Sequence, residues 1–259
     1  QALSNSQLCV EVLALHVELL LGGAGGLRGS LLPVAHVREQ LRVVFAALDL
    51  LHQARTGLPE HPHIARVLDA GTTETGRPYF AMEYVHGLAI TDFCDQHKLD
   101  TNQRIELFLK VCEGVQYAHQ NAIIHRDLKP HNVLVTVQGD QAIPKIIDFG
   151  IAKVGNLPSR ITRDGEVLGT PYYMAPEMLQ RKGDARSDVY SLGVILFECL
   201  TGEVPFKGDS EWEVLRKHEN ETPRYPADLA PGYRRVLDRC LKKDPKQRFA
   251  TVAELAEAL

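Results

Sequence analysis

The segment "IIHRDLKPHNVLV", residues 123–135, decides the fold of this chain of 259 residues. Two further segments follow it in order, "KIIDFGIAK" at 145–153 and "GTPYYMAPE" at 169–177. Each segment alone reads as a polar loop rich in turn residues. Their fixed order and spacing favour one constellation over three unrelated loops.

The polar residues of these segments match the needs of phosphoryl transfer from a nucleotide. That reaction needs a divalent metal held by oxygen ligands, a cation near the transferring phosphate and an acceptor for the hydroxyl proton. Asp127 can orient and deprotonate the attacking hydroxyl, and Lys129 can neutralise the γ-phosphate. Asn132 and Asp148 offer metal-binding oxygens. The sequence therefore predicts catalysis by Asp127, Lys129 and Asn132, with Mg²⁺ held by Asn132 and Asp148.

In the order H-R-D-L-K-P-x-N, D-F-G and A-P-E, these motifs resemble those of the eukaryotic-type protein kinases. The sequence of the motif segments is most similar to bacterial serine/threonine kinases. The resemblance covers about residues 60–259. It implies an α+β, bilobal protein-kinase-like fold, with a small β-rich N-lobe at 1–85 and a larger helical C-lobe at 86–259. It further implies ATP and Mg²⁺ as cofactors, a protein substrate and a place in bacterial signalling.

The nucleotide site is assigned by the same resemblance. Met82 resembles the gatekeeper, and Glu83, Tyr84 and Val85 resemble the hinge that meets adenine through backbone groups. Leu134 resembles the residue beneath the purine ring.

Other residues resemble structural members of the family. His125 and Phe149 resemble two members of the packed spine. Asp188 resembles the carboxylate that braces the catalytic loop, and Arg248 resembles the partner of Glu177. We expect these charges to be buried and therefore paired.

The resemblance also implies a class of acceptor residue and a mode of regulation. Lys129 with Thr170 resembles the serine/threonine branch, and Arg126 before the catalytic aspartate implies control by a phosphate in the activation segment. Thr162 is the first candidate to carry that phosphate and Ser159 the second. The alternative is that both are solvated loop hydroxyls.

The N-terminal part, residues 1–58, departs from the family pattern. "AGGLRGSL" at 24–31 is a near match to the family's glycine-rich phosphate loop, and its candidate nucleotide-binding residues are Gly25, Gly26 and Gly29. The alternative is that this glycine-rich sequence forms a surface turn. Residues 1–58 also contain no lysine and no tyrosine.

The ATP-positioning lysine of the family is missing. "VAHV" at 34–37 has Val37 in the lysine slot, and His52 stands where we expect the pairing glutamate. Losing this clamp should cost on the order of 3 kcal/mol or more, which is about a hundredfold or more in rate.

Two explanations for the missing lysine stay open. One is a pseudokinase that keeps the fold as a nucleotide-binding or scaffold module. The other is a shifted reading frame across residues 1–58. Translating the other two frames tests the second explanation, since one of them should yield a glycine loop followed by V-A-x-K.

Composition narrows the class of protein further. A net charge of −4 gives no positive electrostatic field that would attract nucleic acid. Within residues 234–248, basic residues alternate with Leu237, Cys240 and Leu241 at helical spacing, which is typical of a helix with one solvated face. Five scattered cysteines argue against a disulfide framework or a zinc site. We expect a cytoplasmic domain without a signal peptide or a membrane segment in this chain, with tethering through flanking segments and the oligomeric state left open. A small-molecule phosphotransferase is a further alternative, but it would not be expected to carry "GTPYYMAPE".

Hydrophobic periodicity predicts the main elements. An amphipathic helix is expected over 38–55, preceded by a strand at 31–37, and a hairpin over 64–85. Asp100 or Thr101 should cap a helix that buries one face, and the apolar run 188–200 should form a buried helix. The end of the chain, including 234–249, reads as helical and basic. The members of the capped helix's buried face are Ile105, Phe108, Val111, Val115 and Ala118.

Overall fold

A computed structural model describes residues 61–72, 78–149, 171–180 and 182–259. The chain divides into two compact units, Gln1–Arg38 and Glu39–Leu259, and the described residues all belong to the second. Several predictions fall outside the described residues and stay predictions. They are the helix over 38–55, the strand at 31–37, Gly25, Gly26, Gly29, Val37, Ser159, Thr162 and Thr170.

The predicted hairpin is present. Strand β1 (Val67–Thr72) pairs antiparallel with β2 (Pro78–Met82), with a bulge between Val67 and Asp69. The pairing continues past the strands, because Glu83 donates its backbone N–H to the carbonyl of Arg66 at 2.9 Å. Residues 83–87 then lead without regular structure into the next sheet.

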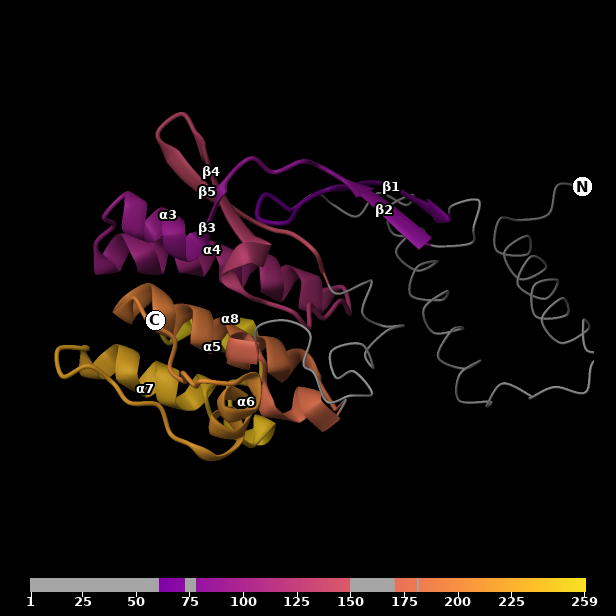
Figure 1. The fold of residues 1–259 in the computed structure, drawn as a ribbon. Helices are drawn as coiled ribbons and strands as arrows, with labels where there is room; N and C mark the ends of the chain where they lie inside the picture. The colour runs from indigo at the N-terminus through magenta and orange to yellow at the C-terminus, as the bar shows by residue number, and fades with distance from the viewer. Residues whose placement is uncertain (1–60, 73–77, 150–170, 181) are drawn as a thin grey trace, which may run out of the picture. The chain divides into compact units, whose positions relative to one another are not determined.

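A second antiparallel sheet has the order β3-β4-β5, formed by Leu88–Ala89, Val133–Gln138 and Gln141–Ile146 (Figure 1). Gly139 turns the β4–β5 hairpin with φ 62°, a conformation that glycine adopts without strain. Gly87 lets the chain approach β4, because a Cβ at this position would lie 2.5 Å from the carbonyl oxygen of Val135.

Helices α3 (Ile90–Gln96) and α4 (Thr101–Gln120) follow β3. Asp100 is the N-cap of α4: its carboxylate accepts the N–H of Gln103, and the Gln103 side chain accepts the N–H of Asp100. The five residues predicted for the inner face are all buried. The predicted helix is therefore confirmed, with Asp100 rather than Thr101 as its cap. In Figure 1, α4 lies between the β4–β5 hairpin and helices α5 and α8, and it contacts all three of these elements.

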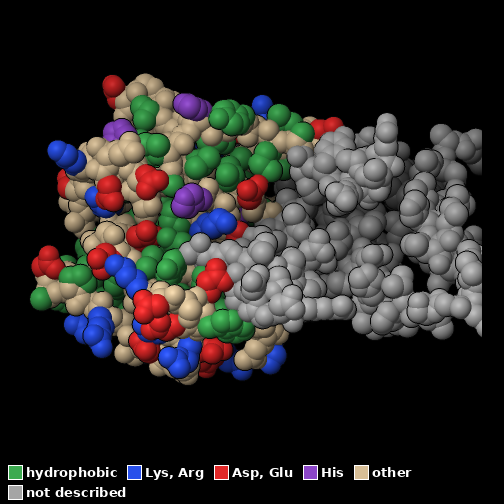
Figure 2. All heavy atoms as spheres, viewed as in Figure 1, with side chains coloured by type: hydrophobic (Ala, Val, Ile, Leu, Met, Phe, Trp, Pro, Cys, Tyr) green, Lys and Arg blue, Asp and Glu red, His purple; other side chains and the backbone are tan. Residues whose placement is uncertain are grey.

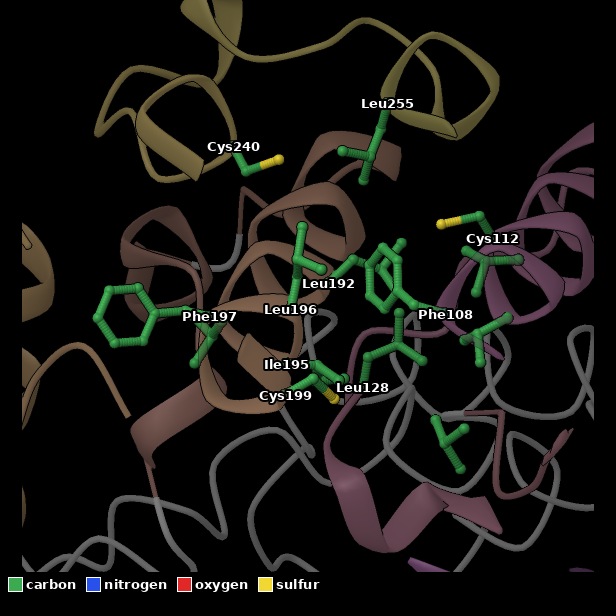
Figure 3. Close-up of a cluster of buried hydrophobic side chains, with 14 of the residues drawn as sticks. Phe108, Cys112, Leu128, Leu192, Ile195, Leu196, Phe197, Cys199, Cys240 and Leu255 are labelled. Atoms are coloured by element: carbon green, nitrogen blue, oxygen red, sulfur yellow. The ribbon is translucent and has the colours of Figure 1, made fainter. Parts of the chain in front are cut away.

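The buried helix is also confirmed. Helix α5 (Ala185–Thr201) begins a few residues before the apolar run, with Asp184 as its N-cap, and every residue from Ser187 to Phe197 is buried. Figure 3 shows Leu192, Ile195, Leu196 and Cys199 of this helix among core side chains from other elements, including Phe108 of α4. Because α5 has no solvent face over this stretch, polar side chains on it must find partners inside the protein.

Shorter elements complete the described chain. They are η1 (Pro130–Asn132), η4 (Pro171–Tyr173), η5 (Pro176–Gln180), α6 (Glu211–Asn220), α7 (Pro231–Cys240), η6 (Pro245–Gln247) and α8 (Val252–Glu257). The sequence did not predict the break in the basic stretch after Cys240, where α7 ends and the separate turn η6 begins at Pro245. Among the helices in these ranges, none combines the length and apolar character that a membrane crossing requires.

The basic stretch has the surface character expected of a solvated helix face. Arg234, Arg235 and Arg239 are exposed on α7, whereas Leu237 and Cys240 are buried beneath them. Figure 2 shows acidic and basic side chains interspersed on the face in view. The four cysteines within the described ranges are buried and free of disulfides.

Candidate active site

The loop of residues 122–132, called the catalytic loop after the catalytic residues predicted in it, connects α4 to β4 and is held by a buried carboxylate. Asp188 of α5 is fully buried and accepts the backbone N–H groups of His125 and Arg126, each at 2.8 Å. The ring nitrogen Nε2 of His119 donates to the same carboxylate at 2.8 Å. Three donors thus compensate one buried negative charge. They fix a loop in which Ala122 and Arg126 have positive φ angles of 60° and 63°.

The imidazole of His125 joins the catalytic loop to the end of β5. Its Nε2 lies 3.0 Å from the carbonyl oxygen of Ile147, and the backbone N–H of Asp127 donates to its Nδ1 at 3.3 Å. A carbonyl oxygen only accepts, so Nε2 is the donor in this hydrogen bond. The ring also packs against Phe149, with centroids 4.7 Å apart. Because both ring nitrogens are engaged, His125 has a structural position rather than that of a base.

Asn132 and Lys129 converge on Asp127. The Asn132 amide nitrogen donates to the Asp127 backbone carbonyl at 2.8 Å and lies 3.3 Å from its Oδ2. The Lys129 ammonium lies 3.4 Å from the same Oδ2. The side chain of Asp127 is only 10% exposed, and these two donors help to orient its carboxylate.

Asp148 follows β5 and is exposed, with a φ of 54°. The residue before it is bound on both sides, because Ile147 donates its N–H to the carbonyl of Asn132 at 2.9 Å and accepts from His125. The backbone that presents Asp148 is thereby joined to the backbone that presents Asn132. A left-handed conformation at a residue other than glycine is strained, and such strain is concentrated at functional sites.

Residues of the predicted nucleotide site lie at the ends of β2 and along β4. Met82 ends β2, Glu83 and Val85 are half-buried, and Tyr84 is 89% exposed. Leu134 of β4 is half-buried opposite Lys145 of β5.

Residues 171–180 lie beside the catalytic loop. A small cavity lies between the two segments, lined by Asp127 and Lys129 on one side and by Tyr173, Met174 and Met178 on the other. Tyr173 is fixed at both ends: its hydroxyl donates to Glu198 at 2.7 Å, and its carbonyl accepts from Ser191 at 2.7 Å. Burial and the hydrogen bond to Glu198 raise the pKa of Tyr173 well above its usual range.

Glu177 and Arg248 form a buried ion pair. The guanidinium is bidentate, with Nη1 and Nη2 at 2.7 and 2.8 Å from the two carboxylate oxygens, and its side chain is 0% exposed. Burial alone would raise the pKa of Glu177, but hydrogen bonds from Arg248 and Ser187 outweigh burial and lower it.

Sequence reasoning did not identify three of these residues. His119 completes the shell of donors around Asp188, Glu198 holds Tyr173, and Lys145 pairs with Glu83 at 2.6 Å. The only available indication was periodicity: His119 lies one residue after the predicted inner face of α4, and Glu198 lies inside an apolar run. A polar residue in such a run must have a partner when the run is buried.

The fold and site define a protein of the kinase-like class, and comparison with known proteins makes the family specific. The family model described as "Protein kinase domain" matches residues 32–258, which begins well before residue 60 and includes the "VAHV" segment. The chain therefore belongs to the protein kinase domain family, and the α+β kinase fold expected from the sequence is confirmed.

Two bacterial relatives illustrate the similarity. The chain is 40% identical over 206 residues to the serine/threonine-protein kinase PknB of Mycobacterium leprae (strain TN), covering 75% of this chain and 32% of that protein. It is 34% identical over 259 residues to the serine/threonine-protein kinase Pkn1 of Myxococcus xanthus, covering 92% of this chain and 36% of that protein. The chain thus spans about a third of the length of these curated relatives.

A solved structure is similar in fold. It is the crystal structure of Rad53 1-466 in complex with AMP-PNP, with a TM-score of 0.65 and 26% sequence identity. The match covers 82% of this chain and 53% of that one.

Proposed function

We propose that the chain is the catalytic domain of a serine/threonine protein kinase, which transfers the γ-phosphate of ATP to serine or threonine hydroxyls of a protein. The observation that carries this proposal is the convergence of Asn132 and Lys129 on the Asp127 carboxylate. Asp127 accepts the proton of the attacking hydroxyl, and Lys129 supplies positive charge beside it.

The donor set fits Mg²⁺ with ATP. Both hydrogen bonds of the Asn132 amide use its nitrogen, which leaves the side-chain oxygen as the ligand atom, and the exposed Asp148 carboxylate offers a second oxygen ligand. Within the described ranges, no group of three or more His, Cys, Asp or Glu side chains could hold a metal alone. Two protein oxygens completed by phosphate oxygens suit Mg²⁺, which compensates phosphate charge when bound.

A protein acceptor is favoured by the segment that lies beside the catalytic loop. Tyr173 is fixed by Glu198 and Ser191, so residues 171–178 form a stable surface next to Asp127. A small-molecule phosphotransferase has no need of this surface. The relatives named serine/threonine-protein kinases support the same assignment.

The alternative is a pseudokinase that acts as a nucleotide-binding or scaffold module without phosphoryl transfer. Val37 in the slot of the ATP-positioning lysine favours this alternative. Under either function, the adenine nucleotide would meet Met82, the backbone of Glu83 and Val85, and the side chain of Leu134.

Incubation of the purified chain with Mg-ATP labelled at the γ-phosphate and a generic protein substrate tests the proposal. We expect label on serine or threonine, and a loss of at least about a hundredfold in Asp127→Asn and Asp148→Asn. Asp140→Asn is the matched control, because this exposed carboxylate lies in the β4–β5 turn. Equal labelling by all three variants would contradict the proposal, whereas nucleotide binding without labelling by the wild type would support the pseudokinase.

A further inference from the structure

An ion pair joins the segment after β2 to strand β5. The Lys145 ammonium lies 2.6 Å from Oε1 of Glu83, and the two side chains are 18% and 25% exposed. Partial burial reduces screening by solvent, so this pair should hold its partners more firmly than a pair on the open surface.

Both ends of the pair rest on backbone that is already anchored. Glu83 donates its N–H to Arg66 at 2.9 Å. Next to Lys145, Ile146 exchanges backbone hydrogen bonds with the segment before β1, donating to the His63 carbonyl at 2.9 Å and accepting from Ala65 at 2.8 Å. A cross-link between two fixed segments sets the distance between them.

The register of the sheet relates this cross-link to the nucleotide site. Leu134 of β4 and Lys145 of β5 are directly paired, so their side chains lie on the same face of the hairpin. The pair therefore extends from a position next to Leu134 to Glu83. These are the two sides between which the proposed function places the purine.

We propose that the Lys145–Glu83 ion pair is a positioning element for the adenine nucleotide, setting the gap between residues 83–85 and Leu134. The inference deepens the proposed function and rests on it. In this inference Lys145 acts through Glu83, whose Oε1 lies 2.6 Å from the Lys145 ammonium.

The pair should affect nucleotide affinity and not turnover. Asp127 and Asn132 are oriented by each other, by Lys129 and by the loop contacts of Asp188. None of these contacts involves Lys145 or Glu83. Breaking the pair should weaken nucleotide binding while the geometry at the hydroxyl acceptor is kept.

Four variants test the inference: Lys145→Met, Glu83→Gln, the two combined, and the charge swap Glu83→Lys with Lys145→Glu. The Kd of a fluorescent ATP analogue with Mg²⁺ is measured by titration, and kcat and KM for ATP are measured on a generic protein substrate. We expect each single change to raise Kd and KM about fivefold to tenfold with kcat within about twofold. The combined neutral variant should match the single variants, and the charge swap should recover most of the affinity.

Lys217→Met is the matched control. Lys217 pairs with Glu213 at 2.8 Å within α6, and the exposed fractions, 23% and 31%, are similar to those of the proposed pair. We expect its Kd to equal that of the wild type.

The inference is overturned if Lys145→Met binds the analogue as tightly as the wild type, or if Lys217→Met weakens binding equally. A charge swap that binds more weakly than both single variants would also overturn it. Failure of the proposed function has a different readout, namely a wild-type chain that binds the analogue and transfers no phosphate.

Discussion

Replacing Arg248 by methionine should strongly destabilise the fold. All five N–H donors of the guanidinium are used: two bind the Glu177 carboxylate at 2.7 and 2.8 Å, and three bind the carbonyls of Lys242, Arg186 and Lys243 at 2.7, 2.9 and 3.1 Å. Methionine has similar length but no donor. Glu177 would lose both charge-assisted donors and keep the weaker, neutral hydrogen bond from the Ser187 hydroxyl, at 2.7 Å.

The expected cost is about 4 kcal/mol, because removing one partner leaves the other charge buried without compensation. Arg248→Lys keeps the charge but offers three donors in place of five, so about 2 kcal/mol is expected. The free energy of unfolding is measured by urea denaturation at pH 7. Lys207→Met is the control, since Lys207 and Glu203 are 58% and 67% exposed, and its cost should be below about 1 kcal/mol.

The pH dependence gives a second check on the same pair. The folded-state pKa of Glu177 lies below its ordinary value, so the stability from the pair is fully present above the unfolded-state pKa. It is lost as the pH falls through the folded-state pKa. The difference in unfolding free energy between wild type and Arg248→Met should therefore narrow in acid. A cost below about 1 kcal/mol at pH 7, or a difference that widens in acid, would refute the reasoning.

Three further predictions concern groups inside the C-terminal part. Burial and the nearby Lys243 lower the pKa of His218 to about 3. As the pH falls, the unfolded state therefore binds a proton at this histidine before the folded state does. The free energy of unfolding should fall by about 2 kcal/mol between pH 7 and pH 5. His218→Gln should reduce this loss, as measured by urea midpoints at both pH values. Asp188→Asn should lower kcat about a hundredfold while circular dichroism shows a kept fold, because an amide cannot accept from all three donors. Tyr173→Phe should cost about 1 to 2 kcal/mol in urea denaturation, because Glu198 loses its donor.

The elements that the sequence predicted are those whose information is local. Helix α4 is defined by the capping box at Asp100 and by apolar residues three and four apart, and both features lie within one stretch of chain. Helix α5 is defined by an apolar run that ends at Gly202, which has a φ of 74°. Its first residues, Ala185, Arg186 and Ser187, were missed because they precede the apolar run, and only the cap at Asp184 marks them.

The contacts that the sequence could not predict join distant parts of the chain. The pairing of His119 with Asp188 and of Lys145 with Glu83 depends on which helix faces and which strand register meet in space. Neither partner has a spacing that points to the other. The sequence also could not predict the positive φ angles of Arg126 and Asp148, because residues other than glycine rarely adopt that backbone conformation.

The anchoring of the site separates two kinds of functional loss. Asp127 and Asn132 are held through Asp188 and His125, all within residues that follow position 118. The sequence predicts that Val37 replaces the ATP-positioning lysine, and we expect such a replacement to act on the position of the nucleotide phosphates. Any loss of activity from this replacement should then be accompanied by weaker nucleotide binding. It would be detected by the same Kd measurement as loss of the Lys145–Glu83 pair. Substitution of Asp188 should instead lower kcat while the nucleotide Kd is unchanged. Measuring kcat and Kd together therefore distinguishes a misplaced nucleotide from a disordered catalytic loop.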